Sequence, residues 1–146
     1  SCEYYPTSQT ILLPSGWSMF STYIDALDND CDAFFAEILV NVIIVKDGNG
    51  QVFWPAYSVN LIGSLSICEG YQIKMSDASE LSIGGAYASP EENPIELNAG
   101  WNMIGYLRTE AAGADLVLAD LVVEDNLIIA KNLCYLIYCH FTKRSN

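Results

Sequence analysis

The sequence predicts an α+β fold that is mainly antiparallel β and is built from two related repeat units, each with one short helix. The first observation is an internal repeat, because ILLPSGWSMFSTYI at 11–24 resembles IELNAGWNMIGYLR at 95–108. The second is a further match between VIIVKD at 42–47 and LIIAKN at 127–132. The third is the recurrence of short apolar runs separated by turn residues, which is typical of strands. We therefore expect a pseudo-symmetric pair of units, the second of them truncated.

The first unit, predicted at residues 9–85, begins as strand, turn, strand. An apolar run at 11–13 leads into PSG at 14–16, which is turn chemistry, and residues 17–24 are rich in aromatic and β-branched side chains. Apolar residues at helical spacing then predict a short amphipathic helix at 31–39, with acidic residues at its start.

A hairpin follows the helix. The continuous apolar run at 42–46 indicates a buried strand, and DGNG at 47–50 favours the positive φ that tight β-turns need. Residues 51–54 return as the partner strand, which Pro55 ends because proline cannot donate into a ladder.

Two more strands complete the first unit. Alternation at 71–75 predicts a half-buried strand, and residues 80–83 predict another that is closed by Gly84-Gly85. Residues 58–66 favour either a short helical turn or a loop. Residues 86–94, with two prolines and paired glutamates, form the predicted linker.

The second unit, predicted at residues 95–146, places its helix at 115–122 and stops matching the first after Asn132. Two explanations stay open. The apolar run at 133–141 pairs as a strand against the first unit and closes one shared compact domain, or it replaces a native tail lost through a change of reading frame. An incomplete second unit would leave an open strand edge, which favours self-association as a dimer.

The charge of the chain excludes some partners. Its 146 residues include 18 acidic and 6 basic ones, for a net charge of −12. Nucleic acid is repelled by such a surface, because binding it depends on neutralising phosphates with Lys and Arg. No run reaches the roughly 18 apolar residues that a membrane helix needs. We therefore expect no nucleic-acid partner and no membrane insertion.

Metal and disulfide chemistry have weak support. The five cysteines form no CxxC, and one histidine cannot complete a Cys/His zinc finger. Pairing of Cys31 with Cys68 is open to the chain if it is secreted. The acidic residues at 28–32 lack the glycine and glutamate of a calcium loop, so they are expected to cap the helix. The sequence predicts no metal and no cofactor.

Aromatic side chains are the candidate ligand-binding residues. Trp54, Tyr57 and Tyr71 are expected to form a surface on which sugar rings stack. Trp17 and Trp101 follow a glycine at equivalent positions of the two units. We expect these two to fill the core of each unit, because repeated units share packing before they share ligands.

No catalytic residues emerge from the sequence. His140 is the one histidine and lies in the divergent tail, so a Ser-His-Asp or Cys-His arrangement has poor support. Carboxylate pairs of the kind that hydrolyse glycosides have no spacing rule, which leaves a small carboxylate-dependent hydrolase as an alternative.

Five motifs stand out along the chain: GWSM at 16–19, VKD at 45–47, GQVFWP at 50–55, EGYQIK at 69–74 and GWNMI at 100–104. Together they resemble a repeat module of secreted surface proteins and phage structural proteins of marine and related bacteria. The resemblance implies a module that sits beside larger domains, and it implies no catalytic residue set.

The sequence therefore predicts a non-enzymatic structural or interaction module, extracellular or virion-associated. It would present a rigid β surface to a protein or glycan partner. The first alternative is a carbohydrate-binding module that uses Trp54, Tyr57 and Tyr71, and the second is the small hydrolase.

Overall fold

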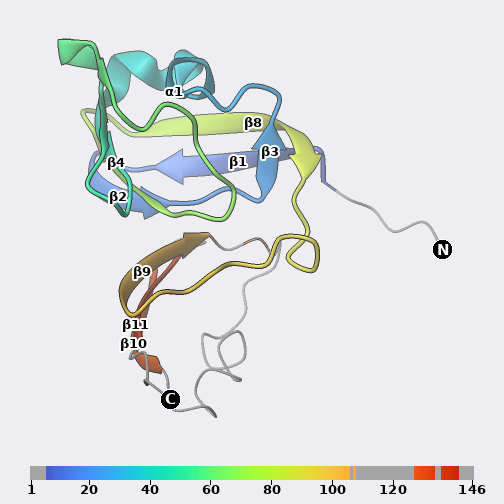
Figure 1. The fold of residues 1–146 in the computed structure, drawn as a ribbon. Coiled ribbons are helices and arrows are strands. Elements are labelled where there is room, and N and C mark those ends of the chain that lie inside the picture. The colour runs from blue at the N-terminus through green and yellow to red at the C-terminus, as the bar shows by residue number, and fades with distance from the viewer. Residues whose placement is uncertain (1–5, 106, 108–126, 134–135, 142–146) are drawn as a thin grey trace.

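Antiparallel pairing dominates the structure, which confirms the prediction of a mainly antiparallel β fold. The computed structural model describes residues 6–105, 107, 127–133 and 136–141. Every strand pair recorded among these residues is antiparallel. Figure 1 shows a larger body formed by the earlier part of the chain and, below it, a smaller sheet drawn in orange and red.

One sheet of the larger body joins β1 (Ser8–Leu13), β8 (Ser79–Tyr87) and β3 (Ile24–Ala26), with β8 in the middle. Burial alternates along β1, so that Ile11 and Leu13 face the core while Leu12 between them faces solvent. This is the two-residue period of a strand with one covered face.

Gly84 and Gly85 lie inside β8, so the prediction that they close the strand is wrong, and β8 runs two residues into the predicted linker. The reason is a close approach between strands. Gly85 pairs with Ala26, and a Cβ at position 85 would overlap the backbone of Asp25. Glycine therefore allows β3 to pair with β8 here.

The other sheet of the larger body has β7 between β2 and β4, and β5 and β6 continue beyond β4. Among the described residues its strands are β2 (Gly16–Phe20), β7 (Tyr71–Met75), β4 (Val42–Lys46), β5 (Val52–Trp54) and β6 (Val59–Asn60). We call it the five-stranded sheet. The strands predicted at 42–46 and 71–75 are confirmed.

The predicted strand–turn–strand unit is present, but its two strands belong to different sheets. β1 pairs with β8, whereas β2 pairs with β7. Gly16 has φ +83, a conformation that glycine adopts without steric cost, and it lies where the chain passes from one sheet to the other. The second strand also ends at Phe20 rather than at Ile24, and Ile24 begins β3.

The hairpin predicted around DGNG is confirmed. Asp47 Oδ1 accepts hydrogen bonds from the backbone N–H of Asn49 and of Gln51, each at 2.8 Å. Gly50 has φ +81, which explains the glycine at that position. Pro55 follows the last residue of β5 and opens the 3-10 turn η2 (Pro55–Tyr57).

The predicted helix is confirmed in two parts, α1 (Cys31–Phe34) and the 3-10 helix η1 (Ala36–Asn41). The side chain of Asp30 accepts a hydrogen bond from the backbone N–H of Asp32 at 3.0 Å, which is the capping role predicted for the acidic residues. Its buried residues cover the core of the larger body.

The core of the larger body combines both sheets and the helical segment. Aromatic rings form its centre, with Phe20 stacked on Tyr71 at 5.6 Å between ring centroids and Phe35 on Phe53 at 5.9 Å. Aliphatic residues of the two sheets surround them, among them Ile11, Leu13, Val45, Ile73, Met75, Leu81 and Ile83.

The smaller sheet consists of β9 (Gly100–Gly105), β10 (Leu127–Leu133) and β11 (Leu136–Phe141), with β11 in the middle. The expected strand at 133–141 is therefore present as β11. It pairs with β9 and β10, so the expectation that it pairs against the first unit is wrong. The helix predicted at 115–122 lies outside the described residues.

Backbone hydrogen bonds join β9 to the larger body. Gly70 N–H donates to the carbonyl of Met103, and Gly105 N–H donates to the carbonyl of Cys68, both at 3.1 Å. A Cβ at Gly105 would overlap the carbonyl oxygen of Ile67, so the close contact requires glycine. We call this contact the junction.

The two glycines of β8 provide a matched test of the fold. Gly85→Ala is expected to lower the free energy of unfolding by about 1–3 kcal/mol, because the new Cβ forces β3 away from β8. Gly84→Ala meets no atom within 4 Å and is expected to stay within about 1 kcal/mol of the wild type. Urea unfolding measures both, and equal stabilities would contradict the close approach.

Candidate functional site

One face of the five-stranded sheet carries exposed and half-buried side chains and is chemically distinctive. Its centre is formed by Trp17 and Met19 of β2, Gln72 and Lys74 of β7, and Lys46 of β4, which we call the outer face. Register places these residues together, since Trp17 pairs with Lys74, and Gln72 pairs with both Met19 and Lys46. The residues that alternate with them on β7 are buried in the core.

Trp17 lies beside two ammonium groups. Lys46 Nζ is 5.1 Å and Lys74 Nζ is 5.8 Å from the centroid of its ring. Both distances are within the roughly 6 Å over which a cation is attracted to an aromatic face. The indole is nevertheless 51% exposed, so part of its surface is free to meet a ligand.

The prediction that Trp17 and Trp101 fill the core is wrong. Trp17 is 51% and Trp101 is 48% exposed. Strand alternation is the cause in β2, because Phe20 takes the core position and Trp17 is an odd number of residues away.

The outer face also collects the positive charge of this part of the chain. Lys46 and Lys74 are the only Lys or Arg residues in the sequence before Arg108, and acidic residues are frequent over the same stretch. Sequence reasoning missed both lysines as site residues. The signal was available for Lys74, because alternation in YQIKM puts it on the face opposite Tyr71 and Ile73.

Two of the three predicted ligand-binding residues come together in the structure. Trp54 and Tyr57 form an edge-to-face pair with ring centroids 4.5 Å apart. Both are exposed, Trp54 at 37% and Tyr57 at 68%. The pair lies where β5 ends and η2 begins, and Ser58 closes that turn with φ 53.

Tyr71 is a core residue, so its prediction as a ligand-binding side chain is wrong. It is 1% exposed and its ring stacks on Phe20. Its hydroxyl accepts a hydrogen bond from the backbone N–H of Ser66 at 2.8 Å and donates to Glu69 Oε2 at 3.2 Å. Burial is the main reason why the pKa of Tyr71 is raised.

Cys31 and Cys68 are free thiols, so the pairing between them that the sequence left open is not formed. Cys31 is fully buried at the start of α1, whereas Cys68 belongs to the segment that meets β9. Burial first, and then the charges of Asp30 and Asp32, raise the pKa of Cys31 from 9.0 to about 12. Burial and the charge of Glu69 raise the pKa of Cys68. A raised pKa disfavours the nucleophilic thiolate.

A hollow of about 290 Å³ lies at the junction. The tip of the β4–β5 hairpin, the segment around Glu69 and the strand β9 all contribute to it. Its lining includes the carboxylates of Glu69 and Glu96 and the indole of Trp101. Asn102 is committed to the local backbone, since its amide donates to the carbonyls of Asn98 and Gly100.

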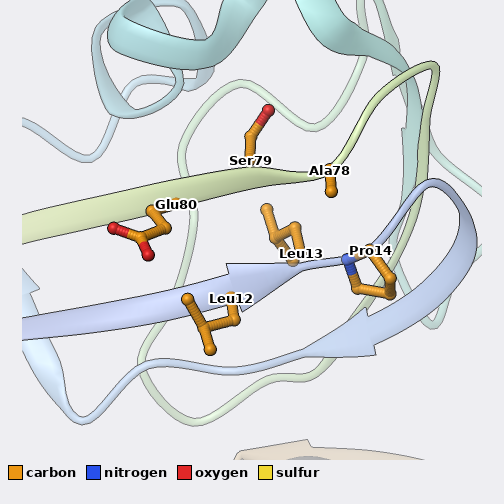
Figure 2. Close-up of a pocket in the computed structure, with 6 residues that line it drawn as sticks. All are labelled: Leu12, Leu13, Pro14, Ala78, Ser79 and Glu80. Atoms are coloured by element: carbon orange, nitrogen blue, oxygen red, sulfur yellow. The ribbon is translucent and has the colours of Figure 1, made fainter.

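A second hollow, of about 460 Å³, lies where β1 ends and β8 begins (Figure 2). Leu12, Leu13 and Pro14 line it from β1 and the turn after it. Ser79 and Glu80 line it from the start of β8, together with Ala78 just before that strand. Glu80 supplies its one carboxylate, and the remainder of the lining is mostly hydrocarbon, so the hollow offers no nucleophile paired with a base.

The chain matches no family model, no curated protein and no solved structure. Among the described residues, no helix has the length and apolar character needed to cross a membrane. The candidate site is therefore chosen from the structure alone. We choose the outer face because an exposed aromatic side chain and positively charged groups lie together there.

Because Cys31 is buried, the free energy of unfolding is expected to change with pH in the alkaline range. The folded state keeps the thiol proton until about pH 12, whereas the unfolded chain loses it near 9.0, so the pKa difference favours unfolding as pH rises between these values. The free energy of unfolding is expected to fall by up to about 1.4 kcal/mol per pH unit from this group. Cys31→Ala should show a shallower slope between pH 9 and 10 in urea unfolding. Identical slopes would contradict the burial of an intact thiol.

Proposed function

We propose that this protein is a non-enzymatic interaction module of a secreted or virion-associated protein, and that it binds an anionic glycan on the outer face. The observation that carries the proposal is the exposed indole of Trp17 with the ammonium groups of Lys46 and Lys74 both within 6 Å of its ring centroid. The secreted or virion-associated location is proposed because the sequence resembles repeat modules of surface and phage proteins.

Uronate and sulfated sugars fit this arrangement chemically. Each such sugar has an apolar C–H face that stacks on an indole, together with an anionic group that pairs with an ammonium. The two lysines are the only Lys or Arg residues before Arg108 in a chain of net charge −12, so they distinguish this face from the other surfaces formed by residues 6–105.

The buried side chains on the opposite side of β7 hold the outer face in place, which favours binding of a ligand without rearrangement. Tyr71, Ile73 and Met75 of β7 are each at most 1% exposed, so the strand that carries Lys74 is fixed by the core. A surface that is already ordered binds at a lower entropic cost than a loop that must be ordered by its ligand.

We also propose that the chain consists of two related units, 9–85 and 95–146, whose separate sheets correspond to each other by pseudo-symmetry. The order β2-β7-β4 in the first corresponds to β9-β11-β10 in the second. In this interpretation β11 of the second unit corresponds to β7 of the first. The sequence repeat had shown no counterpart of β7 in the second unit.

Binding of tetragalacturonate tests the proposed site. Isothermal titration at low salt is expected to show saturable binding that Trp17→Ala weakens about tenfold or more. Lys46→Gln and Lys74→Gln should each weaken it roughly fivefold, the equivalent of about 1 kcal/mol. Leu27→Ala, an exposed apolar truncation elsewhere, is the control and should bind as the wild type does.

The neutral tetrasaccharide maltotetraose separates charge recognition from stacking. It is expected to bind at least about tenfold more weakly than tetragalacturonate, because it has no group for the lysines. Equal binding of the two sugars, or binding that is insensitive to Trp17→Ala, would contradict the proposed site.

A second candidate function is neutral-glycan binding at the Trp54–Tyr57 pair. The observation that favours it is the exposed edge-to-face geometry of the two rings, which offers an angled platform to a sugar. On an array of neutral glycans, this function predicts saturable binding that Trp54→Ala abolishes and Leu61→Ala retains. Binding that survives Trp54→Ala would exclude it.

A further inference from the structure

The two lysines of the outer face lie beside a single aromatic ring. Lys46 Nζ is 5.1 Å and Lys74 Nζ is 5.8 Å from the centroid of the Trp17 ring, so the two ammonium groups are separated by no more than the sum of these distances. One indole face accommodates about one stacked sugar ring. Both positive charges therefore lie beside the same sugar residue of a bound glycan.

Strand register shows how both ammonium groups reach this ring. Trp17 of β2 pairs directly with Lys74 of β7. Lys46 is on β4, two strands away from Trp17, and pairs with Gln72 of β7. Its side chain therefore extends across β7 toward β2, since its ammonium group is 5.1 Å from the centroid of the indole ring. The positive charges of two strands are thus brought together.

In the part of the chain that the structure describes, neither ammonium group forms an ion pair with a carboxylate, and both contact the indole. The carboxylate next to Lys46 in the sequence is that of Asp47, whose Oδ1 accepts the two backbone hydrogen bonds that close the hairpin. Two positive charges near one ring repel each other. A ligand that brings negative charge between Lys46 and Lys74 therefore replaces repulsion by attraction.

The charge of the surrounding chain favours a ligand whose negative charge is concentrated. Residues 6–105 contain 12 Asp and Glu residues, against the two lysines of the outer face. A glycan charged on every sugar residue places most of its charges beyond these lysines, where the acidic excess repels them. A glycan that carries its charge on the stacked sugar avoids this repulsion.

We propose that the outer face prefers a sugar residue that carries two negative charges, a sugar phosphate monoester, over a sugar that carries one. This inference rests on the proposed function of the outer face. A phosphate monoester has a charge of about −1.5 to −2 at pH 7 and three strong acceptor oxygens. One such group accepts hydrogen bonds from both lysines, because the flexible stem of each lysine allows its ammonium group to close on the phosphate.

Gln72 contributes recognition of the sugar itself. It lies between Met19 and Lys46 in the register of the sheet, and its side chain is exposed. A side-chain amide both donates and accepts hydrogen bonds, which suits the hydroxyl groups of a sugar. The indole and this amide therefore favour a sugar phosphate over inorganic phosphate, which has no ring to stack and no hydroxyl-bearing carbon.

Titration with glucose 6-phosphate and with glucuronate, followed at the Trp17 indole N–H in ¹H–¹⁵N spectra, tests the preference. At pH 7.5 glucose 6-phosphate is expected to bind about fivefold or more tightly than glucuronate, because its second charge meets a second lysine. At pH 5 the preference should disappear, since the second pKa of a phosphate monoester is near 6. Glucuronate keeps its charge over this range and reports any change in the protein itself.

Variants assign the effect to the outer face. Lys46→Gln and Lys74→Gln should each weaken binding of glucose 6-phosphate about fivefold, and the double variant should remove its dependence on pH. Gln72→Ala should weaken glucose 6-phosphate about twofold to fivefold and leave binding of inorganic phosphate unchanged. Leu27→Ala is the control, and circular dichroism of each variant confirms that the fold is retained.

The outcomes separate failure of this inference from failure of the proposed function. Equal binding of glucose 6-phosphate and glucuronate at pH 7.5, together with binding of tetragalacturonate that depends on Trp17, would overturn the preference and leave the proposed function intact. Failure of every anionic sugar to bind the wild type would overturn the proposed function itself. Inorganic phosphate that binds as tightly as glucose 6-phosphate, or uridine 5′-monophosphate that binds more tightly, would overturn the assignment to a sugar.

Discussion

The alternation of β7 constrains both faces of the five-stranded sheet. Tyr71, Ile73 and Met75 are buried, which leaves Gln72 and Lys74 on the opposite side. Because β7 pairs with β2 and with β4, its register also decides which residues of those strands share a face. A slip of one residue would exchange core and surface along the whole strand. The position of Lys74 beside the ring of Trp17 is thus a consequence of how the core is packed.

Glycines allow the backbone contacts that hold the remaining parts in place. Gly16 directs the chain from one sheet to the other, and Gly85 lets β3 approach β8. Gly105 lets β9 approach the segment that precedes β7, so the smaller sheet meets the larger body through backbone hydrogen bonds. The first of these positions needs a positive φ, whereas the other two need the absence of a side chain. In the proposed account, these contacts hold two related sheets on one chain.

The sequence was sufficient for elements whose signals are local. The hairpin depends on Asp47 and Gly50, and the helix start depends on Asp30, so short-range hydrogen bonds and backbone preferences determine both. Strand partners were not predictable, because the pairing of β1 with β8 and of β2 with β7 depends on contacts between distant residues. The amino-acid composition of a strand does not determine which other strand it pairs with.

The candidate site was predicted only in part, for a related reason. Aromatic residue type favours both burial and binding, so type alone did not distinguish Tyr71, which is buried, from Trp17, which is exposed. What separates them is the face of the sheet, and the face follows from register. Trp54 and Tyr57 lie side by side because they are close in sequence, and their role in binding a ligand stays a prediction.

The most direct test of the outer face as the binding surface is a two-dimensional ¹H–¹⁵N spectrum of the three indole N–H groups during titration with tetragalacturonate. The account predicts that the Trp17 signal shifts first and saturates, while the Trp54 signal stays in place. A saturable shift of Trp54 with Trp17 unmoved would contradict the central role of the outer face.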